Sequence, residues 1–254
     1  MRVSVLGCDA SITGNLRSTC YRVDDDLLID AGTGAGDLTL EQAVAIDTVF
    51  LTHAHLDHCC MLPMLADAAG SFRDTPLTVY ALAQTISTIR RNILNGEIWP
   101  DYAALPSLEQ PYLRFQPIKQ GETIELKGRR ITALPANHAV PCVAYQIDSG
   151  AGSLVYSGDT TFCEEFWQAL NSIANLKYLL IENTFLAANA EGAARSGHMT
   201  ASLLAQGMRL LQRPVELFIV HMEAGCEENA FREILEAIPE FRPTRLQRGH
   251  EFVI

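Results

Sequence analysis

The segment from Thr52 to His58 carries the densest set of chemically reactive side chains in the sequence. It reads Thr-His-Ala-His-Leu-Asp-His, and it follows the apolar run Ile46 to Leu51, which has the composition of a buried strand. A strand end would place His53 and His55 on one side, and the following turn would bring Asp57 and His58 to a second position nearby. One short loop could therefore supply ligands to two metal ions.

Three further candidate ligands stand just after strand-like runs. They are His138 after residues 131–134, Asp159 after residues 154–156, and His221 after residues 217–220. Loops at strand ends gather functional residues in α/β layers. One histidine there is more often a hydrogen-bonded loop residue than a ligand, but three such positions after a dense His/Asp motif favour a metal site. Asp159, with small neighbours, could bridge two ions through its two oxygens.

The elements that must position these side chains alternate between short branched apolar runs and segments of helical spacing. The predicted strands are Val3 to Leu6, Leu27 to Ile29, Ile46 to Leu51, Leu154 to Tyr156, Tyr178 to Ile181 and Leu217 to Val220. The predicted helices are Met61 to Ala69, Ala83 to Leu94, Glu164 to Ile173, Ala201 to Leu211 and Glu228 to Ala237. This alternation predicts an α/β fold. Turn signals at residues 24–26 and 127–129 predict hairpins, and Asn95 to Gly121 is expected to form a long surface excursion.

Composition limits the function classes. The chain has 254 residues, 48% of them hydrophobic and 19% charged, with no apolar run of the roughly 18 residues that would span a membrane, so we expect one domain over 1–254 and no membrane partner. The formal charge of −11 opposes binding of long nucleic acids and favours a small substrate. The start lacks the apolar region of an export signal, and seven cysteines without Cys-x-x-Cys spacing fit a reducing compartment. A cytoplasmic location is therefore expected.

The His/Asp motif, taken with His138, Asp159 and His221, resembles the metallo-β-lactamase superfamily. That resemblance implies a four-layer αββα sandwich with metals at the sheet edges. A narrower resemblance, to class II cyclic-nucleotide phosphodiesterases, comes from three further stretches: NGEIWPDY at residues 95–102, IEN at 181–183, and SGHMT at 196–200. The sequence departs from that family where Cys59-Cys60-Met61 follows the motif and Pro63 follows Leu62.

The superfamily resemblance implies a ligand scheme. His53, His55 and His138 would hold one metal; Asp57, His58 and His221 would hold the other; Asp159 would bridge them. Such ligands suit Zn²⁺, which is our first choice, and also Mn²⁺ or Fe. Cys59, Cys60 and Cys226 fall outside this set and are predicted to be free buried thiols.

The narrower resemblance implies hydrolysis of a 3′,5′-cyclic nucleotide, cyclic AMP or cyclic GMP, to the 5′-monophosphate. Its catalytic residues would be Asp57, also counted as a ligand, with His198 and Glu182. The departing ribose oxygen is a poor leaving group, so His198 is assigned as proton donor and Glu182 as the group that orients it. Thr200 is expected to cap the helix that follows. The alternative for His198 is a structural hydrogen bond at a helix start.

Other readings stay open. The enzyme alternatives are an RNase Z-like endonuclease and a carbonyl-directed hydrolase of lactonase, β-lactamase or glyoxalase II type, and the non-enzyme alternative is a cyclic-nucleotide binder without turnover. Trp99 could stack on a base, but an anchor for its loop, or for a homodimer contact, is favoured. The glycine-rich loop at residues 32–36 lacks the lysine of a P-loop and is expected to let the backbone pass beneath the metals. His250 is assigned a structural role.

Overall fold

The computed structural model describes residues 1–254, and the chain forms two compact units. Unit 1 comprises Met1–Cys8, Leu16–Lys119 and Arg248–Val253, and unit 2 comprises Asp9–Asn15, Gln120–Gln247 and Ile254. Each unit has its own seven-stranded mixed sheet and its own hydrophobic core. The prediction of a single domain over 1–254 stays a prediction.

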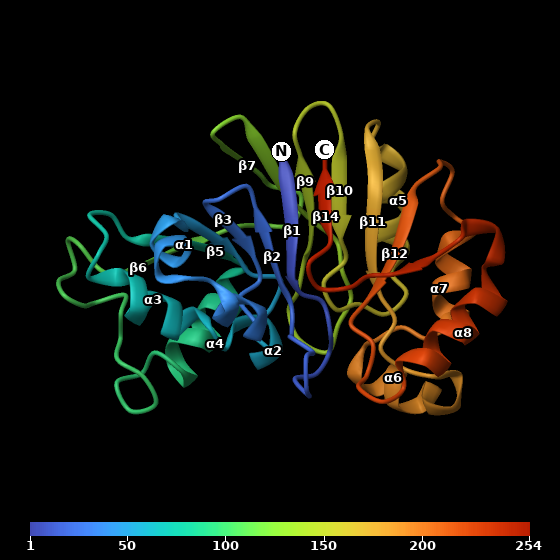
Figure 1. The fold of residues 1–254 in the computed structure, drawn as a ribbon, viewed down its shortest axis with the longest axis horizontal. Helices are drawn as coiled ribbons and strands as arrows, with labels where there is room; N and C mark the ends of the chain where they lie inside the picture. Colours follow the sequence, from blue (N-terminus) through green and yellow to red (C-terminus); the bar gives the residue numbers. More distant parts are fainter. The chain divides into compact units, whose positions relative to one another are not determined.

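The unit 1 sheet has the strand order β14-β1-β2-β3-β4-β5-β6 (Figure 1). The strands are β1 (Arg2–Gly7), β2 (Cys20–Val23), β3 (Leu27–Ile29), β4 (Thr48–Phe50), β5 (Leu77–Ala81), β6 (Leu113–Pro117) and β14 (Glu251–Val253). Strands β3 to β6 run parallel, so their carboxyl ends meet at one edge of the sheet. The loop that follows β4 at this edge carries the His/Asp motif.

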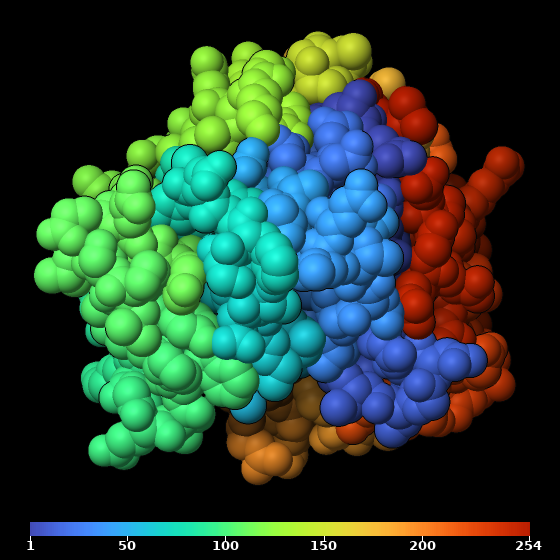
Figure 2. Space-filling model, turned by 60° about the vertical axis from the view of Figure 1, so that its left-hand side comes forward, coloured from blue at the N-terminus to red at the C-terminus, as the bar shows by residue number.

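Helices of unit 1 pack on this sheet. They are η1 (Thr33–Asp37), α1 (Leu40–Ala45), α2 (Leu56–Cys59), α3 (Leu62–Gly70) and α4 (Ala83–Asn92). A capping box between Thr39 and Gln42 starts α1. Figure 2 shows α1 and α3 side by side on the surface of unit 1, in light blue and cyan. Their apolar sides join buried β3, β4 and β5 residues in one core, which holds the sheet edge in place.

The unit 2 sheet has the strand order β13-β12-β11-β10-β9-β8-β7. The strands are β7 (Thr123–Leu126), β8 (Arg129–Leu134), β9 (Ala144–Asp148), β10 (Ser153–Tyr156), β11 (Leu176–Glu182), β12 (Glu216–Val220) and β13 (Thr244–Arg245). Strands β10 to β13 run parallel, whereas β7 to β10 form an antiparallel meander. The parallel strands therefore again gather their carboxyl ends at one edge.

Helices α5, α7 and α8 cover one face of the unit 2 sheet (Figure 1). The helices of this unit are α5 (Glu164–Ser172), η2 (Ala187–Asn189), α6 (Ala190–Ser196), α7 (Ala201–Met208), α8 (Glu227–Ala237) and η3 (Pro239–Phe241). Trp167 of α5 is fully buried, and a Cβ on Gly207 of α7 would lie 2.1 Å from its ring. A side chain larger than glycine at 207 would thus push α7 away from α5.

The predicted strands and helices are all present, with ends shifted by a few residues. Both predicted hairpins are also present, β2–β3 and β7–β8, and their turns place Asp24, Lys127 and Gly128 at positive φ. The surface excursion was predicted too long, because its last part is β6, an edge strand whose mixed polar sequence hides its pairing with β5. No helix of the structure is both long and apolar enough to cross a membrane.

Candidate metal centre

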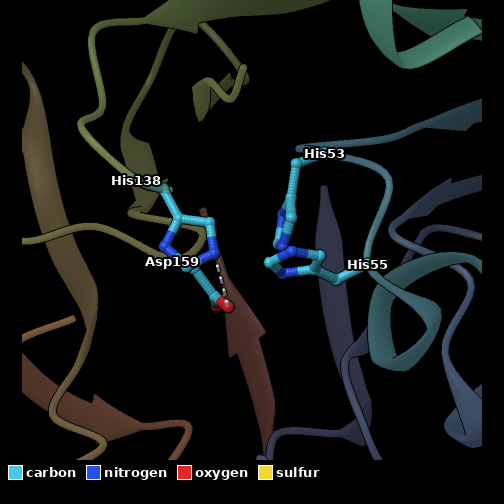
Figure 3. Close-up of side chains that lie close together, drawn as sticks. All are labelled: His53, His55, His138 and Asp159. Carbon is cyan, nitrogen blue, oxygen red and sulfur yellow. Dashed lines mark ion pairs between the residues drawn. The ribbon is translucent and has the colours of Figure 1, made fainter. Parts of the chain in front are cut away.

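The four ligands predicted in unit 1 come together after β4. His53 leaves the strand, His55 is the N-cap of α2, and Asp57 and His58 lie in that helix. The ring centroid of His53 is 4.6 Å from that of His55 and 4.2 Å from that of His58, and Figure 3 shows the edge-on approach of His53 and His55. Nε2 of His58 lies 3.5 Å from Oδ2 of Asp57. Unit 1 therefore presents a compact imidazole and carboxylate cluster.

Asp30 supports this cluster and was missed by the sequence analysis. It lies at the end of β3, fully buried, with a φ of +57° that non-glycine residues seldom adopt. Its carboxylate accepts hydrogen bonds from Nδ1 of His58 at 2.7 Å and from the backbone N–H of Thr52 at 2.8 Å. Burial raises the pKa of Asp30, and the contact with His58 opposes that rise. Because Nδ1 of His58 is engaged, its Nε2 is the atom left for a metal.

The glycine-rich loop lies directly against the motif. A Cβ on Gly32 would stand 2.1 Å from the backbone oxygen of Asp57, so only glycine fits there. The backbone N–H of Ala31 donates to the oxygen of His58 at 2.7 Å. The loop contacts the motif through its backbone, and residues 33–37 form η1. That the backbone passes beneath metals stays a prediction.

The three ligands predicted in unit 2 come together as well. Oδ2 of Asp159 is 3.8 Å from Nε2 of His138, the ion pair dashed in Figure 3, and Oδ1 of Asp159 is 3.3 Å from Nε2 of His221. The two oxygens of one buried carboxylate thus face two different histidines, the arrangement that a bridging ligand needs. His221 has a φ of +57°, which is strain of the kind stored at functional sites.

Gly197 positions His138. Its backbone oxygen accepts from Nδ1 of His138 at 3.0 Å, which leaves Nε2 toward Asp159. Burial lowers the pKa of His138, with Asp159 opposing, and so favours the neutral imidazole that metals bind. Gly197 has a φ of +73°, and a Cβ there would lie 2.8 Å from the backbone nitrogen of Ala139. Both its conformation and its surroundings require glycine.

Glu182 and His198 form the contact that the sequence analysis expected. Oε1 of Glu182 is 2.7 Å from Nδ1 of His198, and the His198 side chain keeps 12% of its surface exposed while Glu182 is fully buried. The carboxylate also accepts from the backbone N–H of Thr160 at 2.8 Å and of Met199 at 3.2 Å. The His198 ring lies 4.7 Å from that of His138. The partly exposed imidazole of His198 therefore lies beside His138 and contacts a carboxylate that backbone N–H groups hold in place.

Several lesser predictions have clear outcomes. Thr200 occupies the N-cap of α7, as predicted, but its hydroxyl contacts Oγ of Ser202 and makes no cap bond. Trp99 packs on the unit 1 core, as expected of a loop anchor.

All seven cysteines are free, as predicted for Cys59, Cys60 and Cys226. Cys59 is buried, and burial raises its pKa to about 12. Cys60 and Cys226 were predicted to be buried but are half-buried.

The donor set fits divalent metal ions. Histidine nitrogens and carboxylate oxygens lie within ligand distance of one another, as at Glu182, His198 and His221 of unit 2, with no thiolate among them. The second ring nitrogen of His58 and that of His138 are tied to protein oxygens, which is usual for histidines that bind metals. The identity of the metals and the roles of the catalytic residues stay predictions.

Comparison with known proteins establishes the family. The family described as "Beta-lactamase superfamily domain" matches residues 26–222, a range that contains all seven predicted ligands together with Glu182 and His198. The chain therefore belongs to the β-lactamase superfamily. The metallo-β-lactamase fold protein YhfI from Bacillus subtilis superposes with a TM-score of 0.76 at 20% identity, covering 99% of this chain and 98% of that one. The predicted fold class is confirmed.

Individual relatives are phosphodiesterases and ribonucleases. A probable 3′,5′-cyclic-nucleotide phosphodiesterase of Yersinia pestis is 26% identical and covers 83% of this chain and 72% of the relative. A ribonuclease Z of Methanopyrus kandleri is 29% identical over 48% of this chain and 40% of the relative. The structure of unliganded yeast PDE1 has a TM-score of 0.80 at 15% identity, covering 98% of both chains. The chain thus has the metallo-β-lactamase fold and is similar in sequence to a probable phosphodiesterase and to a ribonuclease.

We predict that Gly197→Ala destabilises the protein by about 1–3 kcal/mol more than Gly121→Ala does. Both glycines have positive φ, so both variants carry the same backbone strain, but only the Cβ at 197 meets backbone atoms. Urea denaturation of the two variants measures the difference. Equal losses would show that the backbone around His138 relaxes freely.

Proposed function

We propose that the chain hydrolyses 3′,5′-cyclic nucleotides to nucleoside 5′-monophosphates with two divalent ions. The observation that carries this proposal is the pair formed by His198 and Glu182, with Nδ1 and Oε1 2.7 Å apart beside His138 and His221. Hydrolysis at a carbonyl carbon, or of an activated ester, can proceed with metals alone. A ribose oxygen is a poor leaving group, and a fixed imidazole beside the ligands is the device that such a substrate requires.

The proposed ligands follow the superfamily scheme. His53, His55 and His138 would hold one ion, Asp57, His58 and His221 the other, and Asp159 both, with Zn²⁺ as first choice and Mn²⁺ or Fe as alternatives. Two such ions supply activation of a water molecule as nucleophile and neutralisation of charge on the phosphate oxygens. Asp57 would, as ligand, also keep one of the ions positioned for the reaction.

The protein's own acid acts on the departing oxygen. When water attacks phosphorus, the bond from phosphorus to the ribose 3′ oxygen breaks, and that oxygen takes a proton. We assign the proton to Nε2 of His198, because Nδ1 donates to Glu182. The Glu182 carboxylate holds the ring orientation and stabilises the charged imidazolium, and its own place is fixed by the N–H groups of Thr160 and Met199.

An RNase Z-like endonuclease is the second candidate, because ribonuclease Z is among the relatives. The formal charge of −11 disfavours it, since binding a long phosphate backbone relies on lysine and arginine. We therefore propose a small-molecule partner and no long nucleic acid. The free thiols support a cytoplasmic location within the same proposal. A homodimer stays a prediction, and the packing of Trp99 on its own unit's core favours its role as a loop anchor.

The test of this function is a substrate panel. Cyclic AMP or cyclic GMP should be hydrolysed far faster than 2′,3′-cyclic nucleotides, precursor tRNA or a β-lactam, and added salt should change the rate only modestly, because one phosphate makes few salt-sensitive contacts. Product analysis should give the 5′-monophosphate. Efficient trimming of tRNA 3′ extensions with cyclic nucleotides untouched would establish the endonuclease instead.

We expect the purified protein to carry about two divalent ions per chain and to lose hydrolysis on chelation. Asp159→Ala should remove more metal than any single histidine variant, because its two oxygens face histidines of both proposed sets. Elemental analysis of each variant gives the comparison. His250→Ala is the matched control, since His250 packs on Phe252 outside the predicted ligand set. Retention of both ions by Asp159→Ala would exclude its bridging role.

His198→Ala should slow hydrolysis of a cyclic nucleotide by roughly 10²–10⁴-fold while both ions remain bound. Bis(p-nitrophenyl) phosphate releases a stable phenolate that needs no proton, so its hydrolysis by the same variant should fall far less. Steady-state rates on both substrates, with metal content measured in parallel, test this. An equal loss on both substrates would mean that His198 binds the phosphate and donates no proton.

A further inference from the structure

Each unit holds a buried threonine hydroxyl between a carboxylate and a predicted ligand histidine. In unit 2, Oγ1 of Thr184 lies 2.8 Å from Oε2 of Glu182 and 3.0 Å from Nδ1 of His221. In unit 1, Oγ1 of Thr52 lies 2.8 Å from Oδ2 of Asp30 and 3.0 Å from Nδ1 of His53. Thr52 is fully buried and Thr184 is 5% exposed. The same chemical arrangement thus occurs twice in one chain.

The hydrogen count in unit 2 fixes the direction of each bond. A threonine hydroxyl has one hydrogen, and an ionised carboxylate only accepts. At 2.8 Å from Glu182, the hydroxyl must donate to that carboxylate, because otherwise two acceptor oxygens would face each other without a proton. Its oxygen is then an acceptor toward His221. The hydrogen of the His221 ring therefore sits on Nδ1, and the lone pair sits on Nε2, the nitrogen nearest Asp159.

The same count applies in unit 1. The hydroxyl of Thr52 donates to Asp30, whose other partners, Nδ1 of His58 and the backbone N–H of Thr52, are also donors. The hydroxyl oxygen accepts from Nδ1 of His53, and the lone pair of His53 is left on Nε2. Each carboxylate therefore orients one histidine directly and a second one through a threonine.

We propose that Thr184 and Thr52 are positioning residues that hold His221 and His53 in the tautomer with hydrogen on Nδ1, so that each offers Nε2 to a metal ion. This rests on the metal site of the proposed function but not on its substrate. Since His53 and His221 belong to different ions in the proposed scheme, each threonine acts on one ion. Loss of either hydroxyl would let the imidazole adopt the other tautomer, whose Nε2–H cannot bind a metal.

The experiment compares Thr184→Val and Thr52→Val, which replace the hydroxyl with a methyl group of similar size, with Thr184→Ser and Thr52→Ser, which keep it. Zn²⁺ binding is measured by competition with chelators of graded affinity. Each valine variant should bind one of the two ions about 10–100-fold more weakly, and each serine variant should recover most of the loss. Thr48→Val is the matched control, because it makes the same change at a buried β4 side chain with no hydrogen bond to a histidine.

The outcomes separate this inference from the proposed function. Wild-type protein that binds no Zn²⁺ would overturn the metal site itself. Wild-type protein that binds two ions, with valine variants binding both as tightly, would overturn the role of the threonines alone. If a valine variant does not fold, ¹⁵N correlation spectra of the histidine rings in Zn²⁺-loaded wild-type protein decide the question. A hydrogen on Nδ1 of His53 and His221 supports the proposal, and a hydrogen on Nε2 of either contradicts it.

Discussion

The arrangement of the candidate site depends on two carboxylates, Asp30 and Glu182, that are completely buried. A buried charge costs several kcal/mol unless hydrogen-bond donors surround it. The chain supplies those donors from its own strand ends: Thr52 and His58 surround Asp30, and Thr160, Thr184, His198 and Met199 surround Glu182. Loops that carry predicted ligands are therefore fixed by the need to satisfy these oxygens, and the imidazoles are oriented as a consequence.

Two residues of these networks have a positive φ, as do residues elsewhere such as Asp24 and Lys127 in the hairpin turns. Asp30 and His221 both adopt a φ of +57°, and each directly follows a strand that pairs in parallel with its neighbour. Such conformations cost about 1–3 kcal/mol each and persist only where the surroundings determine them. Gly197 solves the same problem without that cost, because glycine reaches positive φ freely and lets its carbonyl approach His138. At each of these three residues, the positive φ and the hydrogen bond that orients a histidine therefore occur together.

Much of the ligand cluster was predictable because its residues follow strong apolar runs, which place strand ends accurately. His53, His138, Asp159 and His221 all stand in such positions. Asp30 follows Leu27 to Ile29 in the same way, and the same rule applied to every strand would have found it. Thr52 and Thr184 had no such signal, since a threonine beside a histidine is common and its role emerges only from distances. β6 was missed because edge strands need no apolar alternation, so its pairing depends on tertiary contacts.

The ligands define the superfamily but leave the substrate open, because activating water and neutralising a phosphate are needed for every phosphodiester. Substrates differ in their leaving group and in the protein surface that binds the rest of the molecule. A ribose oxygen requires a proton as it departs. The Glu182 carboxylate contacts both His198 and Thr184, and Thr184 in turn contacts His221. Moving His198, the proposed acid, would therefore also disturb a proposed metal ligand. In the proposed function, the proton donor and a proposed metal ligand therefore depend on the same carboxylate, that of Glu182.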